Sequence, residues 1–179
     1  LGSALPSNAT AQGVTAGVLP SGTLPVLRGV VAGQAVVNAP VQGANRSTLT
    51  IDQTSSRAII NWNSFNISGD SEVLFRHPDS AASTLNRIFD ANPSVIQGKL
   101  SSTGPAVNGK ATAGGQVILI NQNGILFDRG AQINVQSLVA STLNLSNERF
   151  LSGVLTAGGT VTPAFAGGYD DTGATVPNG

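Results

Sequence analysis

The sequence has 179 residues, enough for one domain with a hydrophobic core, and 40% of them are hydrophobic. Only 10% are charged, nine basic and nine acidic residues give a net charge of zero, and there is no cysteine. Sparse, balanced charge argues against nucleic-acid binding, the lack of cysteine excludes disulfides and cysteine-ligated metals, and apolar runs of about five residues are far shorter than the ~20 that cross a membrane as a helix.

The two ends of the chain differ in composition from its middle. Residues 1–23 are small, uncharged and rich in Gly, Ser, Thr and Pro, without the basic and apolar regions of a signal peptide, so we expect a flexible leader or a cloning remnant. Residues 24–179 are expected to form one domain. Its last stretch, residues 157–179, ends without a capping signal, which predicts the start of a longer structure.

The middle of the chain has the pattern of strands. Short segments rich in Val, Ile, Leu, Thr and Phe alternate with Gly, Asn, Asp, Ser or Pro. Only residues 79–92 favour a short helical turn, since Ala81, Leu85 and Ile88 recur near helical spacing before Pro93. We therefore expect an all-β fold, with strands in residues 47–53, 57–68, 71–77, 95–100, 115–121, 124–127, 131–142 and 153–158.

The spacing of these strands bears on the architecture. Apolar strands that recur at roughly 20 residues with Asn and Gly at the corners are typical of a parallel β-helix. We expect Val117, Leu119, Ile133, Val135 and Leu138 to lie on interior or covered faces. An immunoglobulin-like sandwich, with a turn every ~8–12 residues, gives similar local patterns.

Two strands carry further detail. The apolar residues of "QVILI" and "ILF" are consecutive, which indicates that both faces are covered by other parts of the chain. In residues 57–68, Ile60 and Trp62 are in one phase and Phe65 and Ile67 in the other, so we expect a bulge near Asn63 and Ser64. Trp62 and Phe65 are more readily core or cap residues than a sugar-stacking platform.

The tetrad Asn121-Gln122-Asn123-Gly124 separates two apolar runs in "ILINQNGILF". Asn-Gly is a common turn signal, because both residues tolerate positive φ. We expect Asn121 and Asn123 to bond neighbouring backbone groups while Gly124 takes a positive φ. The simplest interpretation is a turn, and recognition by a partner is the alternative.

No set of residues points to catalysis or to a cofactor. The nine acids are mostly single residues in turn-like contexts, whereas glycoside-cleaving enzymes need converging carboxylates. The single histidine, His77 in "FRHPDS", is expected to be a solvated residue at a strand end. One histidine without cysteine makes a zinc site implausible, so no metal and no cofactor is expected.

Longer strings of residues resemble a known family. These are residues 58–104, with the Trp62 to Phe65 segment, "LNRIF" and "SVIQGKL", and residues 115–142, with the Asn-x-Asn-Gly-Ile loop, "RGA" and "LVAST". In this order they resemble the N-terminal secretion domain (haemagglutination activity domain) of filamentous-haemagglutinin-like exoproteins, the TpsA partners of two-partner secretion. "LPVLRGVVAGQAVV" is similar to the family's mature start. Gln122 replaces the proline of the family's Asn-Pro-Asn-Gly motif, which loosens the turn.

The resemblance implies a right-handed parallel β-helix with an N-terminal cap and extra-helical β-strands. It implies an outer-membrane TpsB transporter as partner, whose POTRA domains bind the chain in the periplasm of a Gram-negative bacterium before the chain folds at the cell surface. Asn121, Gln122, Asn123, Gly124 and Ile125 are then the candidate recognition and turn motif. A monomer without enzymatic activity is expected.

Two functions stay open at this point. The first is a secretion domain that a transporter binds and that nucleates β-helix folding. The second is a surface adhesion module that binds carbohydrate or a host receptor directly. The exoprotein that follows such a domain can be an adhesin, a haemolysin, a haem-acquisition protein or a contact-dependent toxin, and the sequence does not distinguish these.

Overall fold

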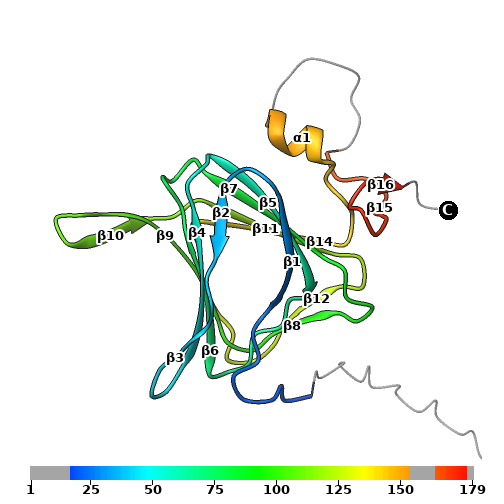
Figure 1. The fold of residues 1–179 in the computed structure, drawn as a ribbon. Helices are drawn as coiled ribbons and strands as arrows, with labels where there is room; N and C mark the ends of the chain where they lie inside the picture. The colour runs from blue at the N-terminus through cyan, green and yellow to red at the C-terminus, as the bar shows by residue number, and fades with distance from the viewer. Residues whose placement is uncertain (1–16, 154–163, 177–179) are drawn as a thin grey trace, which may run out of the picture.

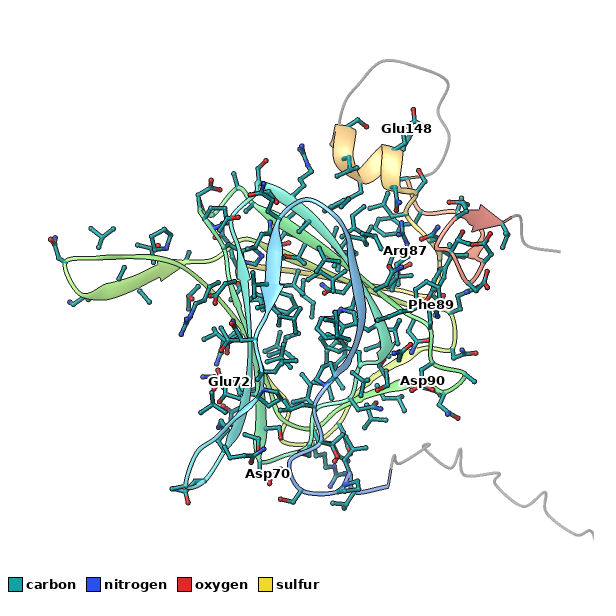
Figure 2. The ribbon with its side chains drawn as sticks, in the orientation of Figure 1. Asp70, Glu72, Arg87, Phe89, Asp90 and Glu148 are labelled. Atoms are coloured by element: carbon teal, nitrogen blue, oxygen red, sulfur yellow. The ribbon has the colours of Figure 1, made fainter. Side chains whose placement is uncertain are left out.

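The computed structural model describes residues 17–153 and 164–176 (Figure 1). Strands dominate these residues, together with one short helix, α1 (Asn147–Ser152), so the expected all-β fold class is confirmed. The chain visits three sheets in a repeating order, and the interior between them holds the core (Figure 2).

Sheet A has the strand order β1-β5-β7-β11-β14. Its last four strands are parallel neighbours, and Arg57, Ser83, Gln116 and Ser137 lie side by side at their starts. The strands are β1 (Val26–Ala32), β5 (Arg57–Ser64), β7 (Ser83–Ile88), β11 (Gln116–Asn121) and β14 (Ser137–Ser141).

Sheet B has the order β10-β9-β6-β4-β2, and β13 pairs with β9 while β3 pairs with β4. Strands β4, β6, β9 and β13 are parallel, whereas β2, β3 and β10 are antiparallel to their neighbours. The strands are β2 (Ala35–Val37), β3 (Val41–Gln42), β4 (Ser47–Gln53), β6 (Ser71–Arg76), β9 (Lys99–Val107), β10 (Lys110–Ala113) and β13 (Gln132–Asn134). Sheet C is the parallel pair β8 (Ser94–Ile96) and β12 (Ile125–Phe127).

The first strands cover one end of this arrangement. Strand β1 lies antiparallel on β5, and β2 and β3 lie antiparallel on β4, so the free edges of the first parallel strands are paired (Figure 1). Val26 pairs with Ser64 and Leu27 with Trp62, which leaves Asn63 between them without a partner in β1. The expected bulge near Asn63 is therefore confirmed.

The main core lies between the sheets. Alternate residues of β4 point inward, because a strand with one covered face has a side-chain period of two. Trp62 and Phe65 both lie in this core without exposed surface, and their rings meet edge to face with centroids 5.3 Å apart. The Trp62 Nε1–H donates to Asn86 Oδ1 over 3.0 Å, which satisfies its polar atom in the apolar interior.

A second apolar cluster lies on the outer face of sheet A. Val117 and Leu119 of β11 point into the main core, while Ile118 and Ile120 point outward and are also buried. The outer face is covered by residues around α1 and by the hairpin of β15 (Gly168–Tyr169) and β16 (Thr175–Val176) (Figure 1). The expectation that both faces of "QVILI" are covered is confirmed.

The helical turn expected within residues 79–92 is wrong, because these residues contain strand β7. Leu85 faces the outer cluster and Ile88 the main core, so the near-helical spacing reflects two covered faces of a strand. The actual helix follows Ser146, whose side chain accepts from the Arg149 N–H as an N-cap. The strand expected in residues 153–158 lies almost wholly outside the described residues.

Three edges are open at the other end of the arrangement. Among the described residues, β12 pairs only with β8, β13 only with β9, and β14 only with β11. The prediction that Ile133 is interior or covered is therefore wrong, since its side chain is 36% exposed, whereas Val135 and Leu138 are half-buried. Phe127 is also exposed, so "ILF" does not have two covered faces. No helix in the described part of the chain is long and apolar enough to cross a membrane.

Candidate functional site

The tetrad forms the turn between β11 and β12. The Gly124 N–H donates to the Asn121 carbonyl over 3.0 Å, and Gly124 has φ of 104°, as expected. The expectation of left-handed geometry for Asn123 as well is wrong, because the non-glycine residue with positive φ in the described chain is Asn108. Gly124 alone supplies the conformation that side-chain-bearing residues avoid.

The two asparagine side chains bond backbone groups, as expected. Asn121 is fully buried, accepts from the Asn123 N–H (2.9 Å), and donates to the Asn92 carbonyl (3.1 Å) and Ser94 Oγ (3.0 Å). Asn123 is exposed and its Nδ2 donates to the Asp90 carbonyl over 2.8 Å. The turn is thus fastened to the preceding loop, residues 90–94, by several hydrogen bonds.

Gln122 connects the turn to the opposite part of the chain. Its Nε2 donates to the Tyr169 carbonyl of β15 over 2.9 Å. The Tyr169 hydroxyl in turn donates to the carbonyls of Ile88 and, over 3.2 Å, Ile120, which are the ends of β7 and β11. No local pattern in the sequence indicates this contact, because it joins residues 47 positions apart.

Ile125, the last residue of the candidate motif, begins β12. It packs against the main core while half-buried, and its strand has one unpaired edge among the described residues. Strand β11, on the other side of the turn, is paired on both edges, with β7 and with β14. Only one flank of the turn therefore has free backbone groups in the folded chain.

A buried arginine lies beside this turn on the outer face of sheet A. Arg87 of β7 is fully buried, and its Nε donates to Asn144 Oδ1 (2.8 Å) and its Nη2 to the Leu145 carbonyl (2.6 Å). Its Nη1 has no hydrogen-bond partner among the described residues. Burial lowers the pKa of Arg87 to about 10, so the guanidinium is charged at neutral pH. A basic residue inside the apolar run "LNRIF" was the available signal, and it was missed.

His77 is not the solvated residue that was expected. It is 3% exposed, and the Gly115 N–H donates to its Nδ1 over 3.0 Å, so Nε2 carries the proton and donates to Thr84 Oγ1 over 2.9 Å. The Thr84 hydroxyl donates to Gln53 Oε1. Burial lowers the pKa of His77 to about 4, which keeps the ring neutral at physiological pH.

The acidic side chains in the described residues form structural contacts. No group of three metal-ligating side chains occurs among these residues. Asp70 accepts hydrogen bonds from the Ser21 and Ser68 hydroxyls and from the Gly22 N–H, and these bonds hold the pKa of its carboxyl well below the ordinary range. Asp70 thus binds residues 21 and 22 to the turn before β6.

Comparison with known proteins identifies relatives of the chain. The family model of the TPS secretion domain matches residues 28–166. Two heme/hemopexin-binding proteins of Haemophilus influenzae are 42% identical over 106 residues and 39% identical over 105, which is 57% and 59% of this chain. The chain spans about a tenth (10%) of these curated relatives.

A solved structure agrees with this assignment. The crystal structure of the HMW1 secretion domain from Haemophilus influenzae matches with a TM-score of 0.55 and 33% sequence identity, over 70% of this chain and 30% of that chain. The family is one of secretion domains of exported proteins, and its members are secreted exoproteins of Gram-negative bacteria that pass through the periplasm. This chain belongs to the TPS secretion domain family.

Proposed function

We propose that the chain is the export signal of a longer, adhesin-like exoprotein, bound in the periplasm by the POTRA domains of an outer-membrane TpsB transporter before it folds. The family match over residues 28–166 is the observation that carries this proposal. The same domain then nucleates folding at the cell surface, acting as a monomer. Each added pass of strands buries apolar area worth about 25 cal/mol per Å², which disfavours return to the periplasm.

We infer that the domain is the first part of a right-handed parallel β-helix with an N-terminal cap and extra-helical strands. The repeating order of sheets B, A and C and the parallel ladders between successive passes support this architecture. The unpaired edges of β12, β13 and β14 offer backbone groups on which a further pass can form.

The division of the chain into a leader, residues 1–23, and a secretion domain, residues 24–179, is part of the proposal. Residues 17–23 are nevertheless bonded to the domain. The Leu19 N–H donates to Gln97 Oε1 over 2.9 Å, and Ser68 donates from its N–H to the Thr23 carbonyl over 3.1 Å. The leader therefore includes a short segment that contacts the folded domain.

The recognition step is assigned to the segment around the tetrad. Its polar residues lie between two apolar strands, which suits capture of an extended chain by strand addition with side-chain pockets for alternate residues. In the folded chain β11 is paired on both edges, so its backbone has no free groups for a partner. Recognition of this strand by backbone pairing thus requires the unfolded chain.

Secretion through the cognate transporter tests the proposal. Asn121→Ala and Asn123→Ala should lower the amount of exported chain, whereas Gly109→Ala, in the exposed Asn-Gly turn of the β9–β10 hairpin, should not. Wild-type export of both tetrad variants, together with reduced stability of the refolded chain, would mean that the tetrad is only a turn. Binding of glycans by the isolated chain, without binding to POTRA domains, would favour the adhesion module instead.

A further inference from the structure

The outer face of sheet A is covered by a separate part of the same chain. We use the name outer layer for residues 144–153 and 164–176, which include α1, β15 and β16. The outer layer lies beside Arg87 and Phe89, while Glu148 on α1 lies farther out (Figure 2). Leu145, Phe150 and Tyr169 of the outer layer are buried against Ile118 and Ile120 of β11.

Polar contacts fasten the outer layer at the tetrad and along β7. Gln122 donates to the Tyr169 carbonyl, and the Tyr169 hydroxyl donates to the ends of β7 and β11. Arg87 donates to Asn144 and Leu145. The docked outer layer therefore contacts both the recognition turn and the strand that precedes it.

A further contact joins the outer layer to the first strand. The Arg28 guanidinium lies 4.3 Å from the centre of the Phe89 ring, and its Nη2 donates to the Asp171 carbonyl over 2.9 Å. The Phe89 and Tyr169 rings meet edge to face with centroids 5.1 Å apart. Docking of the outer layer thus depends on β1, β7 and β11 being in place together.

Docking also buries polar groups without compensation. The hydrogen bonds from Arg87 to Asn144 and Leu145 end on neutral oxygens, and Arg87 Nη1 and Asn61 Oδ1 have no partner among the described residues. Both side chains lie under Gly173, where a Cβ would be 3.3 Å from Arg87 Nη1 and 3.7 Å from Asn61 Nδ2. Because an uncompensated buried charge is unfavourable, undocking, which rehydrates these atoms, is easier than the apolar contacts alone would allow.

We propose that the outer layer is an autoinhibitory latch: undocked, it leaves the tetrad and the outer face of β11 available to the transporter, and docked, it withdraws them. This inference rests on the proposed function and adds regulation to the same site. Closure of the latch after export removes the segment that the transporter binds, so release of the domain follows from its folding. The transporter and the outer layer compete for one surface, and their occupancies are mutually exclusive.

An engineered disulfide tests the latch directly, since the chain has no cysteine. Gln122 and Gly168 face each other across the contact, as a Cβ on Gly168 would lie 3.3 Å from Gln122 Cδ. Gln122→Cys combined with Gly168→Cys gives one chain that is locked when oxidised and free when reduced. The probe is the purified POTRA fragment of the transporter encoded beside the chain, and binding is measured on the folded protein in both redox states.

A second variant changes the latch without a covalent bond. Arg87→Met replaces the buried charge by an apolar side chain of similar length and should hold the outer layer closed, with Lys110→Met at the exposed β9–β10 hairpin as the matched control. Hydrogen exchange of the Asn144 and Ala166 amides, which bond Gly167 and Asn144 across the outer layer, reports the open fraction.

We expect the apparent Kd to rise by the same factor by which the open fraction falls, and the oxidised disulfide to weaken binding by about tenfold or more. A changed open fraction with an unchanged Kd, in either the disulfide variant or Arg87→Met, overturns the latch. A different result overturns the proposed function itself: the urea-unfolded chain fails to bind the POTRA fragment. The two failures are distinguishable because the unfolded chain has no docked outer layer.

Discussion

Protonation of His77 should destabilise the fold over a defined range of pH. The Gly115 N–H donates to Nδ1 of a ring that is 3% exposed, so adding a proton at Nδ1 places two donors against each other and buries a charge. Burial is the larger cause that lowers the pKa of His77, with the Asp79 carboxylate opposing it. The neutral ring is therefore the form that the folded state requires.

The magnitude follows from the shift in the pKa of His77, from its ordinary value of 6.5 to about 4 in the folded chain. Since the folded pKa is the lower one, the unfolded chain binds the extra proton first. The stabilisation is fully present above pH 6.5 and is lost as pH falls from 6.5 to about 4. At about 1.36 kcal/mol for each pKa unit, the loss is roughly 3 kcal/mol.

Urea unfolding at several pH values between 7 and 4 measures this loss. Trp62 is the single tryptophan and is fully buried, so its fluorescence reports the unfolding of the main core. His77→Gln, which does not titrate, provides the reference at each pH. The difference in unfolding free energy between wild type and His77→Gln should shrink by roughly 3 kcal/mol from pH 7 to pH 4. Parallel pH profiles for the two chains would refute the reasoning.

Three further predictions concern the turn, haem and DNA. Gly124→Ala should cost about 1–2 kcal/mol in urea unfolding through backbone strain alone, because a Cβ there meets nothing closer than 3.9 Å, and Gly109→Ala should cost a similar amount, so that only their effects on export differ. Titration with haemin should leave its Soret band unshifted, since there is no Cys or Met, both ring nitrogens of His77 are hydrogen-bonded, and the hydroxyl of Tyr169 is buried and bonded. Gel shift at micromolar protein and physiological salt should detect no DNA binding, and a shift that salt removes would contradict this.

The strands that sequence predicts best are those whose environment is local. Residues 47–53 alternate apolar and polar side chains, and Leu49 and Ile51 of β4 are buried as that period requires. The consecutive apolar residues of β11 indicated two covered faces, and the structure has both. In these strands each residue's side follows from its position alone, so no distant contact is needed to predict it.

The errors arise where distant residues decide the conformation or the burial. Leu85 and Ile88 lie three positions apart, which suits a helix, yet the unpaired edges of β5 and β11 on either side make β7 a strand. His77 is buried because Gly115 and Thr84 supply partners for both ring nitrogens, and neither partner is visible in "FRHPDS". Ile133 has the spacing of a core residue, but no described strand covers its free side.

The candidate site has the same division between local and distant information. The turn at Gly124 follows from the Asn-Gly pair, since the conformation is set by the two residues themselves. Its contact with the outer layer depends on Tyr169, which is reached through Gln122, the residue that replaces the family's proline. Proline has no side-chain amide to donate, so this hydrogen bond exists because of the substitution. The residue that loosens the turn on local grounds is the same residue that fastens it to β15, and the net effect on the turn is decided by the distant partner.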